Sequence, residues 1–156
     1  HEISGGRNGG GTGDMDAFDT AASTTDGIFL DEVVGDMRVG QIFSSKDVSL
    51  RTVAGSIIES VADANVDVRG QTVDIDANGG SIGTASGFLE IDSSRGSPGP
   101  TGTATGGDDV ALEATGDISV DEIDGYLRPV LAPSYTGDIF LSVRESVDLD
   151  EDLILV

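Results

Sequence analysis

The sequence predicts an all-β protein built as a parallel β-helix, that is, a β-solenoid of stacked short-strand coils. Apolar and polar residues alternate along short runs, as in VDVRG and VDIDA, and turn-forming Gly, Asp, Asn or Ser closes each run. A short unit also recurs, as VSLRTVAGSI at 48–57, VDIDANGGSI at 73–82 and VALEATGDI at 110–118. Stacked coils produce such units because each coil buries its apolar side only against its neighbours.

A longer repeat supports the same architecture. Residues 28–38, IFLDEVVGDMR, match residues 118–128, ISVDEIDGYLR, at an offset of 118 − 28 = 90. Coils of roughly 20 to 25 residues would give on the order of seven coils, with strands stacked about 4.8 Å apart. A β-sandwich is the alternative, because strands at regular spacing also suit that fold.

We expect a single continuous domain with four segments. Residues 1–25 are a Gly-rich N-terminal linker or repeat edge, and residues 26–94 form the first β repeat unit. Residues 95–107, RGSPGPTGTATGG, form a Pro/Gly-rich loop, because Pro and Gly exclude a central strand. Residues 108–156 form a second, partial β repeat unit.

One stretch, residues 53–64, could be taken for a helix. It contains Gly55 and the adjacent Ile57 and Ile58, and β-branched residues and Gly lower helix propensity. We therefore predict a strand with a turn there.

The charge of the chain restricts its partners. Acidic residues outnumber basic ones by 29 to 8, which gives a formal net charge of -21, so cations or a saline medium are expected to relieve self-repulsion. The same field disfavours binding to nucleic acid and to anionic lipid. The sequence contains no apolar run of about 18 residues, so we expect no membrane insertion. The chain has no Cys, and its composition favours an extracellular or cell-surface location.

Several segments resemble a known family. They are GIFLDEVVGDMRVGQIFSSKDVSL, VDIDANGGSIGT, FLEIDSS and GDISVDEIDGYL, within about residues 26–145. Their style is similar to the long repeats of giant, acidic, haemagglutinin-like (filamentous haemagglutinin-type) bacterial surface proteins. The resemblance implies a β-helical rod that displays or spaces other modules, with no catalytic residues. The chain departs from the pattern at Pro129, Pro133 and Tyr135, where we expect the coil to bulge or end.

The strongest candidate metal site is DIDANG, residues 74–79. Asp74, Asp76 and Asn78 have the alternating oxygen ligands that open a calcium loop of EF-hand type. The twelfth position of such a loop is Ala85, so the bidentate Glu is missing. In the other interpretation Val73 and Ile75 face the core, the two carboxylates face solvent, and Asn78 begins a turn.

Two acidic pairs recur in the long repeat, Asp31 with Glu32 and Asp121 with Glu122. In a strand, one member of each pair faces outward and the other faces the core side, where a carboxylate needs a partner. Arg38 and Arg128 recur at the same spacing as candidate ion-pair partners; cation binding and plain solvent exposure are the alternatives.

Two further acidic segments are weaker candidates. The acidic run at 148–152 suggests a solvated end or a metal ligand set. GGTGDMDAF at 10–18 approaches a calcium-binding nonapeptide but has Met15 where Asp is required.

These observations predict a non-catalytic structural or adhesive repeat module of a large extracellular or cell-surface protein. We expect no enzyme, because His1 is the sole His and no nucleophile with a base is apparent. The expected partners are neighbouring repeats, copies of the chain, or surface glycans, and the expected cofactor is Ca²⁺. One alternative is a self-assembling extracellular filament that donates the C-terminal strand 153–156, and a weaker one is a carbohydrate-binding or carbohydrate-cleaving β-helix.

Overall fold

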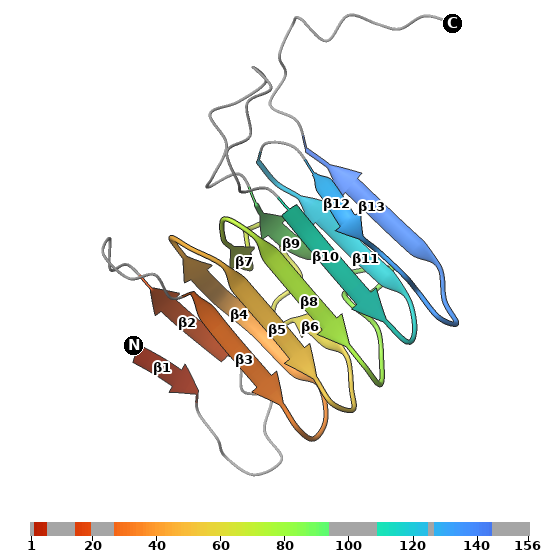
Figure 1. Cartoon of the computed structure of the whole chain (residues 1–156), viewed down its shortest axis with the longest axis horizontal. Coiled ribbons are helices and arrows are strands. Elements are labelled where there is room, and N and C mark those ends of the chain that lie inside the picture. Colours follow the sequence, from red (N-terminus) through yellow and green to blue (C-terminus); the bar gives the residue numbers. More distant parts are fainter. Residues whose placement is uncertain (1, 6–14, 20–26, 94–108, 125–126, 145–156) are drawn as a thin grey trace, which may run out of the picture.

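The computed structural model describes residues 2–5, 15–19, 27–93, 109–124 and 127–144. Two sheets face each other, and the chain passes back and forth between them as it advances along the stack (Figure 1). The described residues contain strands and turns only, as predicted. Among them, none forms a helix of the length and apolarity that a membrane span requires.

The two sheets share almost all of the regular structure. The larger sheet contains β1 (Glu2–Gly5), β2 (Met15–Asp19), β4 (Met37–Ser44), β6 (Ile57–Glu59), β7 (Val68–Arg69), β9 (Leu89–Asp92), β11 (Ile118–Glu122) and β13 (Ile139–Val143). The smaller sheet contains β3 (Ile28–Glu32), β5 (Val48–Thr52), β8 (Val73–Ala77), β10 (Asp109–Ala114) and β12 (Arg128–Leu131).

Strand direction decides the architecture. Every described strand pair is parallel except β1 with β2, so the chain forms a β-solenoid of about four turns. The prediction of a parallel β-helix is confirmed. The alternative of a β-sandwich is wrong, because sandwiches are built from antiparallel pairs.

The short sequence unit corresponds to one structural turn. Val48, Val73 and Val110 are paired in register on β5, β8 and β10, and Ile57, Ile82 and Ile118 are bridged in the same order. One turn advances the chain by 73 − 48 = 25 residues, within the predicted coil length. The described residues form about four turns and not the seven coils expected, and part of the difference is that the turn that includes the β9–β10 connection takes 110 − 73 = 37 residues.

The long repeat does not mark equivalent places in the fold. Residues 28–32 form β3 in the smaller sheet, whereas residues 118–122 form β11 in the larger one. The two copies therefore share strand character but lie on opposite sheets. A strand of alternating residues suits either sheet, since both present one face to the same core.

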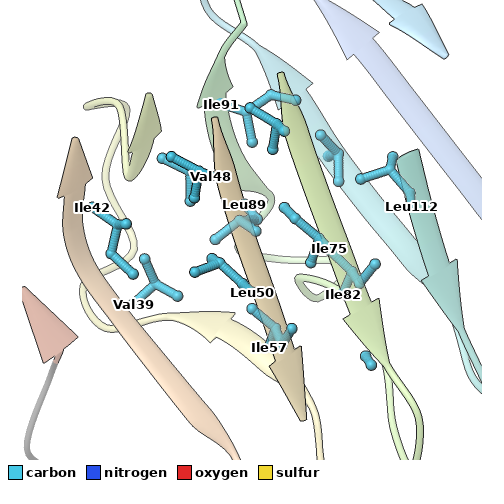
Figure 2. Close-up of a cluster of buried hydrophobic side chains, with 14 of the residues drawn as sticks. Val39, Ile42, Val48, Leu50, Ile57, Ile75, Ile82, Leu89, Ile91 and Leu112 are labelled. Carbon is cyan, nitrogen blue, oxygen red and sulfur yellow. The ribbon is translucent and has the colours of Figure 1, made fainter. Parts of the chain in front are cut away.

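The core lies between the sheets and is aliphatic (Figure 2). Inward residues of successive turns stack in columns, such as Leu50, Ile75 and Leu112, and each of these three is 0% exposed. Full burial of one such side chain stabilises the fold by about 1.5–3 kcal/mol, so the columns hold the turns together.

One corner of the solenoid has its own hydrogen-bond ladder. The hydroxyl of Ser56 accepts from the backbone N–H of Ser81 at 3.0 Å, and the hydroxyl of Ser81 accepts from the N–H of Asp117 at 2.9 Å. Gly80 precedes Ser81 because a Cβ there would lie 2.3 Å from the Ser56 Oγ. The Gly-Ser/Asp-Ile signature in the repeated unit thus specifies a corner at which side chains satisfy backbone donors.

Several local predictions can be compared with the structure. Residues 57–59 form strand β6, so the strand prediction for 53–64 is confirmed. The pairing of β10 with β12 shifts register between Val110↔Pro129 and Ala111↔Leu131, which is the bulge expected near Pro129. Within residues 1–25, β1 and β2 are strands, and β2 pairs with β4. The loop 95–107 lies outside the described residues.

Candidate functional site

The larger sheet has a break in its regular stacking. Strand β4 runs unbroken over residues 37–44, but the next turn covers it with two short strands, β6 and β7. Residues 60–67 leave the sheet between these two strands. A cavity of about 260 Å³ lies there, bounded by Gly40 and Gln41 of β4 and by residues of the 60–67 segment.

Three carboxylates converge at this break. Glu59 ends β6, Asp67 precedes β7, and Glu90 lies on β9 of the following turn. One oxygen from each lies within 4.8 Å of the others. The side chains are buried, with Glu59 8%, Asp67 7% and Glu90 3% exposed.

Backbone contacts fix two of the carboxylates. The N–H of Glu90 donates to Asp67 Oδ2 at 3.3 Å, and the N–H of Asp67 donates to the carbonyl of Glu90 at 2.9 Å. The N–H of Asp63 donates to Glu59 Oε2 at 3.4 Å. Gly87 also makes the arrangement possible, because a Cβ at that position would lie 1.9 Å from Glu59 Oε1.

Glu90 carries the clearest unsatisfied group. Its Oε1 lies 3.7 Å from Nη2 of Arg144. Its Oε2 is buried and has no hydrogen-bond partner among the described residues while the three carboxyl groups are ionised. Protonation allows a side-chain hydrogen bond between Asp67 and Glu90. A buried carboxylate oxygen without a donor is unfavourable unless a proton or a cation occupies the space beside it.

Crowding of the three carboxylates changes their protonation. Burial, together with repulsion from Glu90, raises the pKa of Asp67 to about 8. Burial and repulsion from Glu59 raise the pKa of Glu90 to about 7. Burial also raises the pKa of Glu59. The cluster therefore retains a proton near neutral pH when nothing else compensates its charge.

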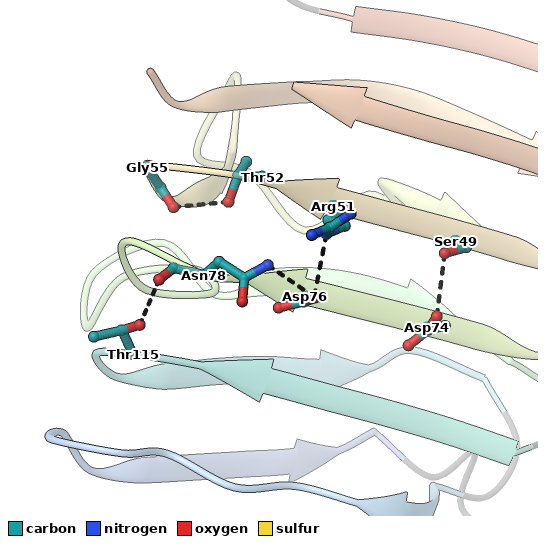
Figure 3. Close-up of polar contacts among 8 residues, drawn as sticks. All are labelled: Ser49, Arg51, Thr52, Gly55, Asp74, Asp76, Asn78 and Thr115. Carbon is teal, nitrogen blue, oxygen red and sulfur yellow. Dashed lines mark hydrogen bonds and ion pairs between the residues drawn. The ribbon is translucent and has the colours of Figure 1, made fainter. Parts of the chain in front are cut away.

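The sequence-predicted calcium ligands lie elsewhere, on β8 and the turn after it (Figure 3). Val73 and Ile75 are buried and Asp74 is exposed, as in the interpretation that makes this segment an ordinary strand. Asp74 Oδ2 accepts from the Ser49 hydroxyl at 3.1 Å, and Asp76 Oδ2 accepts from Asn78 Nδ2 at 3.0 Å. Calcium binding at Asp74, Asp76 and Asn78 stays a prediction.

The first recurring acidic pair lies at the edge of the smaller sheet. Asp31 is exposed and Glu32 is half-buried on β3. The N–H of Val34 donates to Glu32 Oε1 at 3.2 Å. Arg38 does not pair with this segment but donates from Nη2 to the Ser60 carbonyl at 3.3 Å.

The second pair, on β11, is buried, so the expectation of solvent exposure is wrong here. Asp121 is 4% exposed and Glu122 is 0% exposed. Asp121 Oδ2 pairs with Nε of Arg144 at 2.5 Å, and the expected partner Arg128 pairs instead with Asp109 at 3.2 Å. The difference arises because β11 is covered by turns on both sides, whereas β3 is an edge strand.

Sequence reasoning missed Glu59, Asp67 and Glu90. One signal was present: 90 − 67 = 23, which is the offset of the adjoining pair Val68↔Ile91 and lies within the predicted coil length of roughly 20 to 25 residues, so the two carboxylates lie on successive turns. No motif marks Glu59. The acidic run 148–152 and residues 10–14 of the nonapeptide-like segment 10–18 lie outside the described residues, and the rest of that segment is part of β2.

Comparisons of the chain with protein-family models, with curated proteins and with solved structures find no match. The structure thus establishes a class, a parallel β-solenoid with a carboxylate cluster at a break in one sheet.

Proposed function

We propose that the chain is a non-catalytic structural or adhesive module of a large extracellular or cell-surface protein. In this proposal the C-terminal end of the solenoid is a stacking surface on which a further coil packs. The observation that supports it most is the exposed apolar face of the last described turn.

That face is the continuation of the core columns. Ile139 and Leu141 on β13 are paired with Ile118 and Val120 on β11. The β11 residues are 0% exposed, but Ile139 is 44% and Leu141 38% exposed. The two strands have the same character and register, so the difference in burial reflects only what covers them.

A further coil of the same kind fits this surface best. Strand β13 is the edge of a parallel sheet, and its unpaired backbone groups can extend the ladder. The apolar side chains already project in the spacing that one more turn would bury. Such stacking is what a rod-like spacer or display module requires.

Hydrogen exchange tests the stacking surface. We expect the backbone amides of β13 to exchange as slowly as those of β11 in the intact protein isolated from its source, and much faster in the 156-residue chain alone. Fast exchange of β13 in both would overturn the proposal. Antibody labelling of intact against lysed cells tests the proposed surface location, with labelling of intact cells expected.

Enzymatic cleavage of a carbohydrate is the second candidate, because paired acidic residues catalyse glycoside hydrolysis. The described geometry favours it less. Of the three carboxylates only Asp67 lines the cavity, and no Phe or Tyr is among the cavity-lining residues. An assay for new reducing ends on polysaccharides decides between the two; release that is lost in Asp67→Asn would establish the enzyme.

The filament alternative depends on the strand 153–156, which lies outside the described residues. Removing these four residues and measuring particle size by electron microscopy tests it, since fibres that persist without them would exclude strand donation.

A further inference from the structure

We propose that Glu59, Asp67 and Glu90 bind one calcium ion between two successive turns of the solenoid. This site is separate from the stacking surface and from the calcium loop that the sequence suggests at residues 74–79. It would join the turn that contains β6 and β7 to the turn that contains β9.

The positions of the oxygens fit a calcium ion. Ca²⁺ binds oxygens at about 2.3–2.6 Å, so two ligands on opposite sides of the ion are about 4.8 Å apart. The three carboxylates each present an oxygen within that separation of the others. Mg²⁺ is less suited to three carboxylates, because it dehydrates reluctantly and is usually bound by one or two carboxylates with several waters retained.

Glu90 supplies the independent indication of a ligand. The residue is 3% exposed, and its Oε2 is buried without a hydrogen-bond donor among the described residues. Two other carboxylates approach this side chain, and the ion pair that the described residues give it is with Arg144, 3.7 Å from Oε1. A cation at the point where the three carboxylates converge would compensate the charge of all three at once.

The adjoining cavity can hold the water ligands that three carboxylates alone do not provide. Ca²⁺ takes six to eight oxygen ligands, and waters complete many of its sites. The cavity beside Asp67 is also lined by Ser60, Asp63 and Asn65, whose polar groups can hold such waters.

The first measurement is calcium binding by isothermal titration calorimetry, with thermal melts of the same protein. In chelator-treated protein at pH 7.5, we expect one calcium ion to bind, and millimolar CaCl₂ to raise the Tm by about 5 °C over sodium chloride of equal ionic strength. We expect MgCl₂ to give a smaller shift. Equal shifts in calcium and in matched sodium would show that only charge screening acts and would overturn the proposal.

Variants locate the ion. Glu90→Gln and Asp67→Asn should lower calcium affinity at least tenfold, whereas Asp74→Asn and Glu113→Gln, which remove the same charge from the outer face of the smaller sheet, should retain it. Both cluster variants remove repulsion, so we expect them to fold in chelator. Unchanged calcium binding in both cluster variants would contradict the proposal, as would its loss in Asp74→Asn alone.

Proton release gives a second readout. The retained proton must leave when the ion enters, so calcium binding in two buffers of different ionisation enthalpy should give different apparent heats at pH 7. If calcium bound at a distant site, this cluster would keep its proton, and the heats in the two buffers would be equal. Equal heats would therefore count against binding at these three carboxylates.

Discussion

Glu90 and Glu122 are buried to the same degree on neighbouring strands but are satisfied in different ways. Glu122 takes an inward position in the core column on β11, where it pairs with Ile91 on one side and Val143 on the other. Its Oε1 accepts from the N–H of Ser93 at 2.9 Å and its Oε2 from the Ser93 hydroxyl at 2.8 Å. Glu90, on β9, has an Oε2 without a donor and two carboxylates beside it.

This difference separates a structural carboxylate from a binding carboxylate. Glu122 is complete within the protein, because both of its oxygens accept hydrogen bonds from Ser93, which follows β9 of the preceding turn. The protein compensates Glu90 only in part, through Arg144. Burial alone therefore does not indicate a site; the deciding property is whether the fold itself supplies the donors.

The largest effect is expected from Glu122→Ala. The substitution leaves the N–H and hydroxyl of Ser93 without their acceptor and opens a cavity in the core, so it should lower the free energy of unfolding by about 3 kcal/mol. Urea denaturation measures the loss. Ser93→Ala is the matched control, with a smaller loss of about 1 kcal/mol because the backbone N–H remains bonded. A Glu122→Ala protein as stable as the parent would refute the structural assignment.

The pH dependence of stability should come from the cluster of Glu59, Asp67 and Glu90. Burial raises the pKa of Asp67 to about 8 and of Glu90 to about 7 in the folded chain. Both are carboxyls with pKa values near 4 when unfolded, so between about pH 4 and pH 8 the folded state binds more protons than the unfolded state. In chelator, stability should thus fall as pH rises through this window.

Melts at several pH values check this dependence. The double variant Asp67→Asn/Glu90→Gln should flatten the curve. Stability that rises between pH 5 and pH 8 in chelator would contradict the raised pKa values.

A smaller effect of opposite sign is expected from Glu90→Gln. At pH 8 in chelator the substitution removes like-charge repulsion, so it should raise the free energy of unfolding by on the order of 1 kcal/mol. Urea titration in chelator detects the change. A loss of similar size would mean that the ion pair with Arg144 outweighs the repulsion.

The sequence predicted the fold well because the repeated unit and the structural turn coincide. Val73 and Ile75 alternate with Asp74 and Asp76, and stacking places each residue beside its counterpart in VSLRTVAGSI or VALEATGDI. The number of turns could not be predicted in the same way. The Pro/Gly-rich loop 95–107 was predicted, but the alternation does not reveal that one turn includes it and is therefore longer than the others.

The candidate site was much harder to predict. Glu59 ends β6, Asp67 precedes β7 and Glu90 lies within β9. Glu59 and Asp67 come together because the 60–67 segment leaves the sheet between β6 and β7. A motif search favours ligands that are close in sequence, and so it selected residues 74–79. In a solenoid, carboxylates one turn apart are neighbours, so the length of the turn is the more useful spacing.

The smallest expected effect is that of Asp76→Asn, which compares the sequence-predicted calcium loop with the carboxylate cluster. Asp76 forms an ion pair with Arg51 at 3.6 Å, and the Arg51 side chain is 51% exposed. Such an exposed pair contributes about 0.5 kcal/mol, and an amide oxygen can still accept from Asn78. We expect a loss of that size, equal in chelator and in millimolar calcium.

If the loss appears only in calcium, Asp74, Asp76 and Asn78 bind the ion, because removing a ligand lowers stability only when the ligand is occupied. The same melts on Glu90→Gln then show whether the chain has one calcium site or two.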